Sequence, residues 1–183
     1  MKRAAVAAKR VAAHYGLTDT AMGPMLVAVA GDRLIAVKFN VDEGRLARAV
    51  EDLHRETRGT FELVRSDAKV RPCAKQLREY LAGKRAGFDL RLDVSWVTPF
   101  RRAVLEECAR IPRGTTATYG DLARRVGRPN AYRAVGHTMS ANPIPIVIPC
   151  HRVVGASGDL TGFGGGLEMK LRLLALEGVA LAV

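Results

Sequence analysis

The chain has 183 residues and a formal net charge of +11, a length that suits one or two small domains. No apolar run approaches the length of a membrane span, and the three cysteines without paired spacing point to a reducing compartment. We therefore expect a cytoplasmic protein that contacts no membrane. The charge suits a polyanionic partner such as DNA, although many basic proteins simply carry a solvated basic surface.

The first 20 residues form a segment of their own in the sequence. Residues 1–20 are basic and alanine-rich, and Lys9 and Arg10 interrupt any signal-peptide core. We expect a loose arm or a short amphipathic helix that packs on the body of the protein. An organellar transit peptide is the other interpretation of this composition.

Residues 21–95 predict an α+β N-terminal domain, a small antiparallel sheet with helices. The turn signal Gly31-Asp32 joins the first two strands of this sheet. The apolar periodicity changes between that of strands and that of helices along the segment. The expected strands cover residues 25–30, 33–39, 61–64 and 88–94, and the expected helices cover residues 42–56 and 68–81.

Residues 96–183 predict a mainly helical C-terminal domain that contains a helix-turn-helix. Thr118 and Asp121 have the spacing of an acidic capping box, which would begin a short helix that ends near residue 126. A glycine-containing turn and a second helix over residues 131–140 follow. Helix, tight turn and helix are the layout of a helix-turn-helix.

Two further helices flank this motif. Thr98 and Pro99 are typical of a helix start, and this helix would run to about residue 111. Residues 159–166 are a glycine-rich loop that lacks the Lys-Ser/Thr of a P-loop, which favours a loop that closes over a substrate. In the last helix, one face would carry three leucines, Leu167, Leu171 and Leu174.

The most informative segment runs from Ile144 to Val154. It sets Cys150 beside His151 at the end of an apolar, β-branched stretch, which predicts a buried strand, and Pro149 fixes the approach to the thiol. A thiol beside a base is a candidate nucleophile, although free cysteine is also common in cores. Neighbours in a strand point to opposite faces, so either the backbone turns sharply between the two residues or a water bridges them.

This segment resembles a known active-site signature. Pro149-Cys150-His151-Arg152-Val153-Val154, preceded by Asn142-Pro143, is similar to that of the O6-alkylguanine-DNA alkyltransferases, suicide repair proteins that move an alkyl group from guanine onto a cysteine. The resemblance covers about residues 95 to 178 in the family's order and spacing. It is carried further by residues 111–114, 118–123, 133–136, 161–167 and 173–178.

The resemblance implies an activity and a set of catalytic residues. The chain would act as a monomer on double-stranded DNA that carries O6-alkylguanine, or O4-alkylthymine, with no cofactor and no metal. Glu177 would orient His151 and favour its protonated form, and His151 would act through a water on Cys150, so we expect a depressed thiol pKa. Tyr119 would hydrogen-bond the flipped guanine, and Asn142 would tie the helix-turn-helix to the active-site segment. Without the resemblance, Tyr119 would be interpreted as a tyrosine packed at a helix start. Asn142 would be a turn residue before Pro143, and Glu177 a residue that only ends a helix.

The resemblance also implies how DNA and guanine are held. The second helix of the motif would enter the minor groove, where small residues permit close approach and Arg133 would fill the gap left by the flipped base. Without the resemblance, Arg133 would be read as a phosphate contact. The implied DNA contacts are Thr118, Tyr119, Arg128, Ala131, Arg133, Ala134 and Gly136, with His137 a weaker candidate. The implied substrate pocket is lined by Pro145, Val153, Phe163, Gly164 and Gly165.

Three positions depart from the family pattern. Leu105 stands where many relatives have tryptophan, Phe163 where many have tyrosine, and Gly164 where many have a side chain. Because Phe163 removes a pocket hydroxyl, the departures bear on substrate preference and not on the reaction.

Other functions fit the sequence less well. A lesion-binding protein of the alkyltransferase-like type would lack the cysteine that this chain has at position 150. An ordinary helix-turn-helix regulator would not explain the Pro-Cys-His-Arg segment, and a cysteine hydrolase lacks a recognisable partner arrangement beyond His151. We expect Cys108 in the core, no ligand partners for Cys73, and His14 and His54 at the surface.

Overall fold

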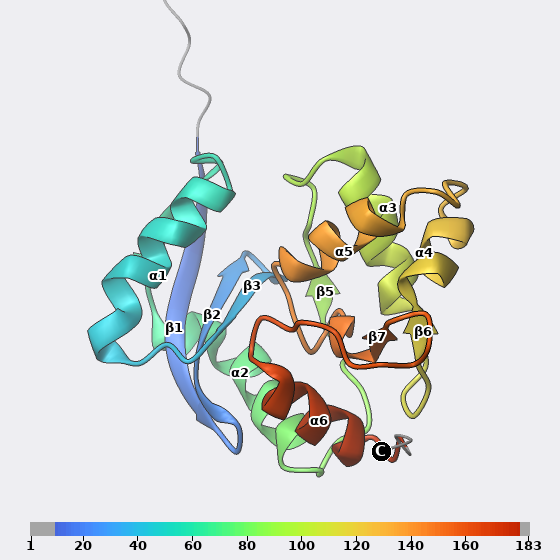
Figure 1. The fold of residues 1–183 in the computed structure, drawn as a ribbon. Coiled ribbons are helices and arrows are strands. Elements are labelled where there is room, and N and C mark those ends of the chain that lie inside the picture. The colour runs from blue at the N-terminus through green and yellow to red at the C-terminus, as the bar shows by residue number, and fades with distance from the viewer. Residues whose placement is uncertain (1–9, 180–183) are drawn as a thin grey trace, which may run out of the picture.

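The computed structural model describes residues 10–179 as two units packed against each other (Figure 1). The N-terminal unit is a five-stranded sheet with helices on both faces. Its strands lie in the order β4-β1-β2-β3-β5 and comprise β1 Val11–Thr20, β2 Gly23–Ala30, β3 Arg33–Phe39, β4 Phe61–Arg65 and β5 Arg91–Leu92. Its helices are α1 Glu43–Glu56 and α2 Asp67–Leu81. Strands β2, β3 and β4 and both helices lie within two residues of the predicted ranges.

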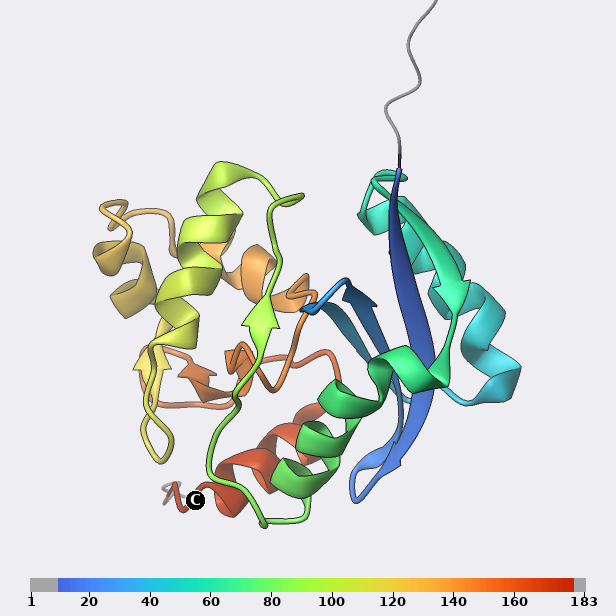
Figure 2. The same ribbon diagram turned by 180° about the vertical axis from the view of Figure 1, so that it is seen from behind.

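Alternation along β2 determines what each face of the sheet contacts. Leu26 and Ala28 pack with α1 in one hydrophobic cluster. Met25 and Val27 point to the opposite face, where they pack with α2 and the C-terminal unit in the other cluster. The two views show α1 on the outer face of the sheet and α2 between the sheet and the C-terminal unit (Figure 2).

Strand β1 is the main departure from the expected N-terminal unit. The sequence predicts an arm or helix over residues 1–20, but residues 11–20 form β1, so the prediction is wrong there. The strand pairs antiparallel with β2 and parallel with β4. Its alanine, glycine and aspartate residues have little β propensity, so pairing on both edges stabilises it instead. Residues 1–9 of the expected arm lie outside the described residues.

The sheet is mixed and not antiparallel as expected. Both outer strands, β4 and β5, run parallel to their neighbours β1 and β3. Only Arg91–Leu92 of the predicted strand 88–94 pairs with the sheet. Phe88, Leu90 and Val94 are partly buried against the core, so their alternation with charged residues reflects one-sided burial of an extended segment.

The C-terminal unit is mainly helical, as predicted. Pro99 begins its first helix, although the Thr98 side chain makes no capping hydrogen bond. The predicted capping box of Thr118 and Asp121 is present at the start of α4. The elements are α3 Pro99–Ala109, β6 Ala117–Thr118, α4 Tyr119–Arg125, α5 Tyr132–Ser140, the 3-10 helix η1 Cys150–Arg152, β7 Val153–Val154 and α6 Leu167–Leu176.

Helix α6 buries a different face from the predicted one. Leu174 is buried, but Leu167 and Leu171 are 47% and 43% exposed. The buried positions are Met169, Lys170, Leu173 and Leu174. Lys170 takes a place on this face because its ammonium reaches backbone carbonyl groups. Both views show α6 beside α2, which brings this helix against the N-terminal unit (Figures 1 and 2). Across residues 10–179, no helix has the length and apolar character that a membrane crossing requires.

Candidate active site

The segment before Cys150 is a series of turns and not the predicted buried strand. Ile148 N–H donates to the Ile144 carbonyl and Cys150 N–H donates to the Ile148 carbonyl, so the chain folds back on itself. The prolines in this segment have no backbone N–H to donate to a neighbouring strand, which explains why this apolar segment does not join a β-sheet. Ile146 has a φ of 74°, a left-handed conformation that costs a β-branched residue about 1–3 kcal/mol.

The turn continues through the active-site pair. Cys150 begins the 3-10 helix η1, so the backbone bends between Cys150 and His151, which is one of the two arrangements that the sequence left open. Cys150 is 6% exposed and lines a cleft, whereas His151 is completely buried and points to Glu177. The bend thus directs the thiol to the cleft and the imidazole into the interior.

The cleft has a volume of about 380 Å³ and lies between the two units. Three of the five predicted pocket residues, Pro145, Phe163 and Gly164, line it together with Cys150. The other two do not: Val153 is fully buried, and Gly165 packs so closely that an added Cβ would overlap Met169. The structure adds lining residues that the sequence did not indicate, among them Val37, Phe39, Trp96, Arg101 and Met139.

Direct contacts fix the two walls of the cleft to each other. Val37 N–H in β3 donates to the Pro143 carbonyl at 2.9 Å. The rings of Phe39 and Phe163 lie 5.4 Å apart between centroids. Strand β3 is therefore part of the site, although its own sequence has only the pattern of a buried strand.

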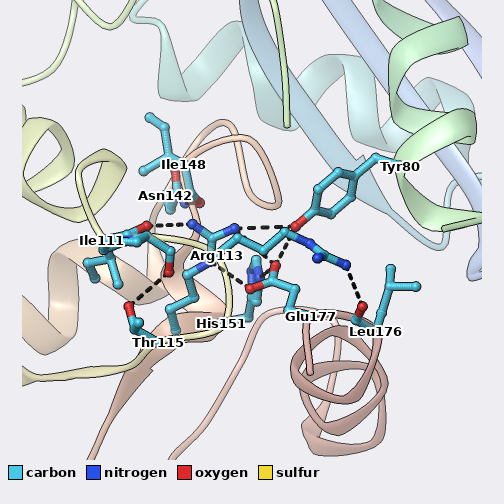
Figure 3. A network of polar contacts seen from close by, with 11 residues as sticks. Tyr80, Ile111, Arg113, Thr115, Asn142, Ile148, His151, Leu176 and Glu177 are labelled. Carbon is cyan, nitrogen blue, oxygen red and sulfur yellow. Dashed lines mark hydrogen bonds and ion pairs between the residues drawn. The ribbon is translucent and has the colours of Figure 1, made fainter. Parts of the chain in front are cut away.

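Glu177 and His151 are in direct contact, as the resemblance implied. Their atoms Oε1 and Nε2 are 2.6 Å apart, and both side chains are buried (Figure 3). Burial alone would raise the pKa of Glu177, but donors from His151 and Arg152 outweigh it and lower that pKa to about 2. The carboxylate is therefore ionised and can only accept hydrogen bonds, so His151 Nε2 carries a proton and donates to it.

The second imidazole nitrogen is an acceptor. Burial lowers the pKa of His151, and Glu177 only partly opposes this shift, so the ring is neutral at pH 7. This neutral state differs from the expectation that Glu177 favours the imidazolium. A neutral ring with its proton on Nε2 leaves a lone pair on Nδ1, and this buried atom has no hydrogen-bond partner within residues 10–179.

The resting thiol also differs from the expectation of a depressed pKa. Burial raises the pKa of Cys150 to about 11, while the Asn142 side chain and the Lys170 ammonium act in the opposite direction. Lys170 is itself buried and donates to the carbonyl groups of Val153, at 2.7 Å, and Thr161, at 3.2 Å. Cys150 is therefore a thiol in the resting protein and needs a base to react.

Asn142 connects the turn before Cys150 to the end of α5. Its Nδ2 donates to the Ile148 carbonyl at 2.9 Å, and its Oδ1 accepts from Ile144 N–H at 3.0 Å. Both partners belong to the active-site turn, so the side chain holds the shape of that turn while lining the cleft.

The residues implied in DNA contact lie on and around α4 and α5. Arg128, Arg133 and Ala134 are exposed, and Thr118, Tyr119, Ala131 and Gly136 are partly buried. Arg133 lies over the ring of Tyr132, with the guanidinium carbon 5.7 Å from the ring centroid. The Tyr119 and Thr161 hydroxyl oxygens are 2.6 Å apart, so the start of α4 lies beside the glycine-rich loop.

Three buried polar residues of the site were missed. Arg152 donates to Glu177 from Nε at 2.7 Å and from Nη2 at 3.1 Å, and Tyr80 also donates to this carboxylate. The position of Arg152 in the Pro-Cys-His-Arg segment could have indicated its role. The periodicity of α2 places Tyr80 on a buried face, but no pattern in the sequence indicates the polar partners of Tyr80 or Lys170.

The other cysteines and histidines make no hydrogen bond within this network across the described residues. Cys73 and Cys108 are free and buried, His14 is partly buried, and His54 is exposed. The expected burial of Cys108 and exposure of His54 are thus confirmed, whereas His14 is only partly exposed because it lies in the paired strand β1. The described part of the chain holds no group of three or more His, Cys, Asp or Glu side chains placed to bind a metal.

Comparison with known proteins agrees with this geometry over both units. Residues 13–94 match the family described as 6-O-methylguanine DNA methyltransferase, ribonuclease-like domain, and residues 99–179 match its DNA binding domain. A Methanosarcina acetivorans protein named methylated-DNA--protein-cysteine methyltransferase is 38% identical over 165 residues, which are 90% of this chain and 98% of that protein. An inducible methyltransferase of the same name from Bacillus subtilis is 42% identical over 73% of this chain and 76% of its own.

Solved structures give the same result. The Mycobacterium tuberculosis OGT in complex with DNA matches with a TM-score of 0.75 and 36% identity, over 90% of this chain and 92% of that one. The O6-methylguanine-DNA methyltransferase of the archaeon Pyrococcus kodakaraensis matches with a TM-score of 0.67 and 30% identity, over 91% and 99% of the two chains. The chain therefore belongs to the 6-O-methylguanine DNA methyltransferase family.

Proposed function

We propose that this protein repairs DNA by direct reversal, transferring the alkyl group of O6-alkylguanine to Cys150. The observation that carries the proposal is the pairing of a cleft-facing thiol with a buried, neutral His151 that Glu177 orients. Family membership and the names of the relatives support the same reaction.

The chemistry follows from the charge states in the site. Cys150 Sγ attacks the alkyl carbon, the Sγ–C bond forms, and the bond from that carbon to guanine O6 breaks. A water carries the thiol proton to His151 Nδ1, and the electron pair of the broken bond stays on guanine, where the Tyr119 phenol donates a hydrogen bond. The imidazolium then returns the proton to the base through solvent, which leaves neutral guanine and a thioether.

The reaction stops after one turnover. A thioether has no ionisable proton and is a poor leaving group, so Cys150 is not regenerated. The protein is then consumed in proportion to the lesions it repairs, and no cofactor takes part.

DNA would be held by α4 and α5 acting as a helix-turn-helix. Arg128 and Arg133 are exposed cations, and the small Ala131, Ala134 and Gly136 allow α5 to approach the minor groove closely. Arg133 would occupy the gap left when the damaged base is flipped into the cleft. Thr118 and Tyr119 at the start of α4 would contact the backbone of the target nucleotide.

The cleft would take the flipped base between Phe163, Gly164 and Pro145. Phe163 offers no hydroxyl to the base, so the Gly164 N–H is the donor that remains beside it for guanine O6. O4-alkylthymine is a second substrate to test. We expect a monomer in the cytoplasm, where the three unpaired cysteines remain reduced.

A stoichiometry assay tests the proposal against lesion binding without transfer. A duplex with one O6-methylguanine is added in excess to the wild-type protein and to Cys150→Ser, and repaired DNA and bound DNA are measured separately. One repaired lesion per wild-type molecule, with binding but no repair by Cys150→Ser, is the expected result. Binding without repair by the wild-type protein would favour the alkyltransferase-like alternative.

A further inference from the structure

Tyr80 brings the N-terminal unit into direct contact with the buried carboxylate. It lies in α2, is 1% exposed, and donates its phenolic hydrogen to Glu177 Oε1 (Figure 3). Its oxygen accepts from Arg152 Nη2 at 3.3 Å. Phe88 holds the ring from the N-terminal side, with 4.6 Å between centroids. The catalytic carboxylate thus depends on a residue 97 positions earlier in the chain.

The donors on Glu177 are unevenly divided between its two oxygens. Oε1 accepts from His151, Tyr80 and Arg152 Nη2, while Oε2 accepts from Arg152 Nε. His151 and Tyr80 therefore share one oxygen. Each donor stabilises negative charge on that atom and reduces the charge available to the other donors.

We propose that Tyr80 is a positioning residue for alkyl transfer, through which the N-terminal unit sets the orientation and proton affinity of His151. The inference rests on the proposed function, since it concerns the base of that reaction. The phenol acts through Glu177 and does not line the cleft. Its hydroxyl limits how strongly the carboxylate attracts a proton to His151, and its ring fixes where the carboxylate lies.

The sign of the effect follows from the sharing of Oε1. Without the Tyr80 hydroxyl, more carboxylate charge is directed to His151, so the imidazolium is stabilised and the His151 pKa rises. The neutral base is then less populated at acidic and neutral pH. The other titratable groups around this network are Arg152 beside Glu177, Lys170 from α6, Cys150 in η1 and Cys108 from α3.

The experiment compares Tyr80→Phe with Phe88→Leu. Phe88→Leu disturbs the same packing but leaves the hydroxyl in place. The rate of transfer from O6-methylguanine DNA under single-turnover conditions is measured from pH 5.5 to 9, with melting temperatures for each protein. For Tyr80→Phe we expect the apparent pKa that governs the rise of the transfer rate with pH to increase by about half a unit. Below that pKa, the rate should therefore fall by about threefold. Phe88→Leu should keep the wild-type apparent pKa, because the Tyr80 hydroxyl is still present, and any change in its absolute rate would reflect the altered packing.

A second variant reverses the expected sign. 3-Fluorotyrosine at position 80 keeps the ring and hydroxyl but is a stronger donor, so the rising limb should move to lower pH. Profiles that coincide for wild type, Tyr80→Phe and the fluorinated protein would overturn the role of Tyr80, whatever happens to the melting temperatures. Because these comparisons require a wild-type protein that transfers, absence of transfer by the wild type would instead contradict the proposed function.

Discussion

Replacing Glu177 by glutamine should destabilise the protein in a pH-dependent way. The carboxylate is 4% exposed and accepts hydrogen bonds from His151, Arg152 and Tyr80. Its pKa falls from 4.5 to about 2 in the folded protein, which corresponds to about 3 kcal/mol of stabilisation. Loss of one partner from a buried ion pair has a similar cost, about 3–5 kcal/mol. Glu177→Gln should therefore lower the free energy of unfolding by about 3 kcal/mol at pH 7.

The pH dependence gives the prediction its sign. A carboxyl group with a depressed folded-state pKa stabilises the fold above pH 4.5, and this stabilisation is lost as the pH falls towards 2. Glutamine cannot titrate, so the difference between the two proteins should shrink between pH 4.5 and 3. Urea unfolding followed by the fluorescence of Trp96 measures it, with the exposed Glu106→Gln as the control. A difference below about 1 kcal/mol, or one that is constant with pH, would mean that the ionised Glu177 carboxylate does not stabilise the fold.

The remaining predictions concern the reaction and the DNA surface. Glu177→Gln should also slow transfer by about tenfold to a hundredfold at pH 7 while retaining DNA binding, because His151 becomes a weaker base. If the pH–rate profiles of the variant and the wild type coincide in single-turnover assays, Glu177 has only a structural role. Arg133→Ala should slow repair of duplex DNA far more than reaction with free O6-methylguanine base, and equal losses on both substrates would assign Arg133 to folding or chemistry. DNA binding by Cys150→Ser, measured by fluorescence anisotropy, should weaken as salt rises, and a salt-independent affinity would contradict the basic surface. Gly165→Ala should reduce transfer because the new Cβ would overlap Met169 and lie 3.1 Å from Phe163. Gly164→Ala should be tolerated because its Cβ meets nothing within 4 Å. Equal transfer rates for the two variants would show that the close packing at Gly165 does not shape the cleft.

Local signals in the sequence predicted most of the helices. The capping box of Thr118 and Asp121 marks the start of α4, and apolar periodicity marks α1 and α2. Strand β1 was missed because its stability comes from pairing with β2 and β4 and not from its own residues. The strand predicted before Cys150 was wrong because burial in a series of turns produces the same apolar run as burial in a sheet.

The sequence predicted the site residues that belong to the active-site motif, but not those that the N-terminal unit contributes. The contact of His151 with Glu177 was expected from the resemblance and is present at 2.6 Å. Phe39 and Tyr80 enter the site only because the N-terminal unit packs against it. The predicted charge states of Cys150 and His151 were wrong because the pKa values of both groups depend on burial, which the sequence pattern does not reveal.

Identifying the residue that receives the alkyl group shows directly whether Cys150 is the acceptor. The protein is incubated with duplex DNA that carries O6-methylguanine with a labelled methyl group, digested, and mapped by mass spectrometry. We expect one methyl group per molecule, found on the peptide that contains Cys150 and absent from those that contain Cys73 and Cys108. Label on either of those two cysteines, or on no cysteine, would contradict it.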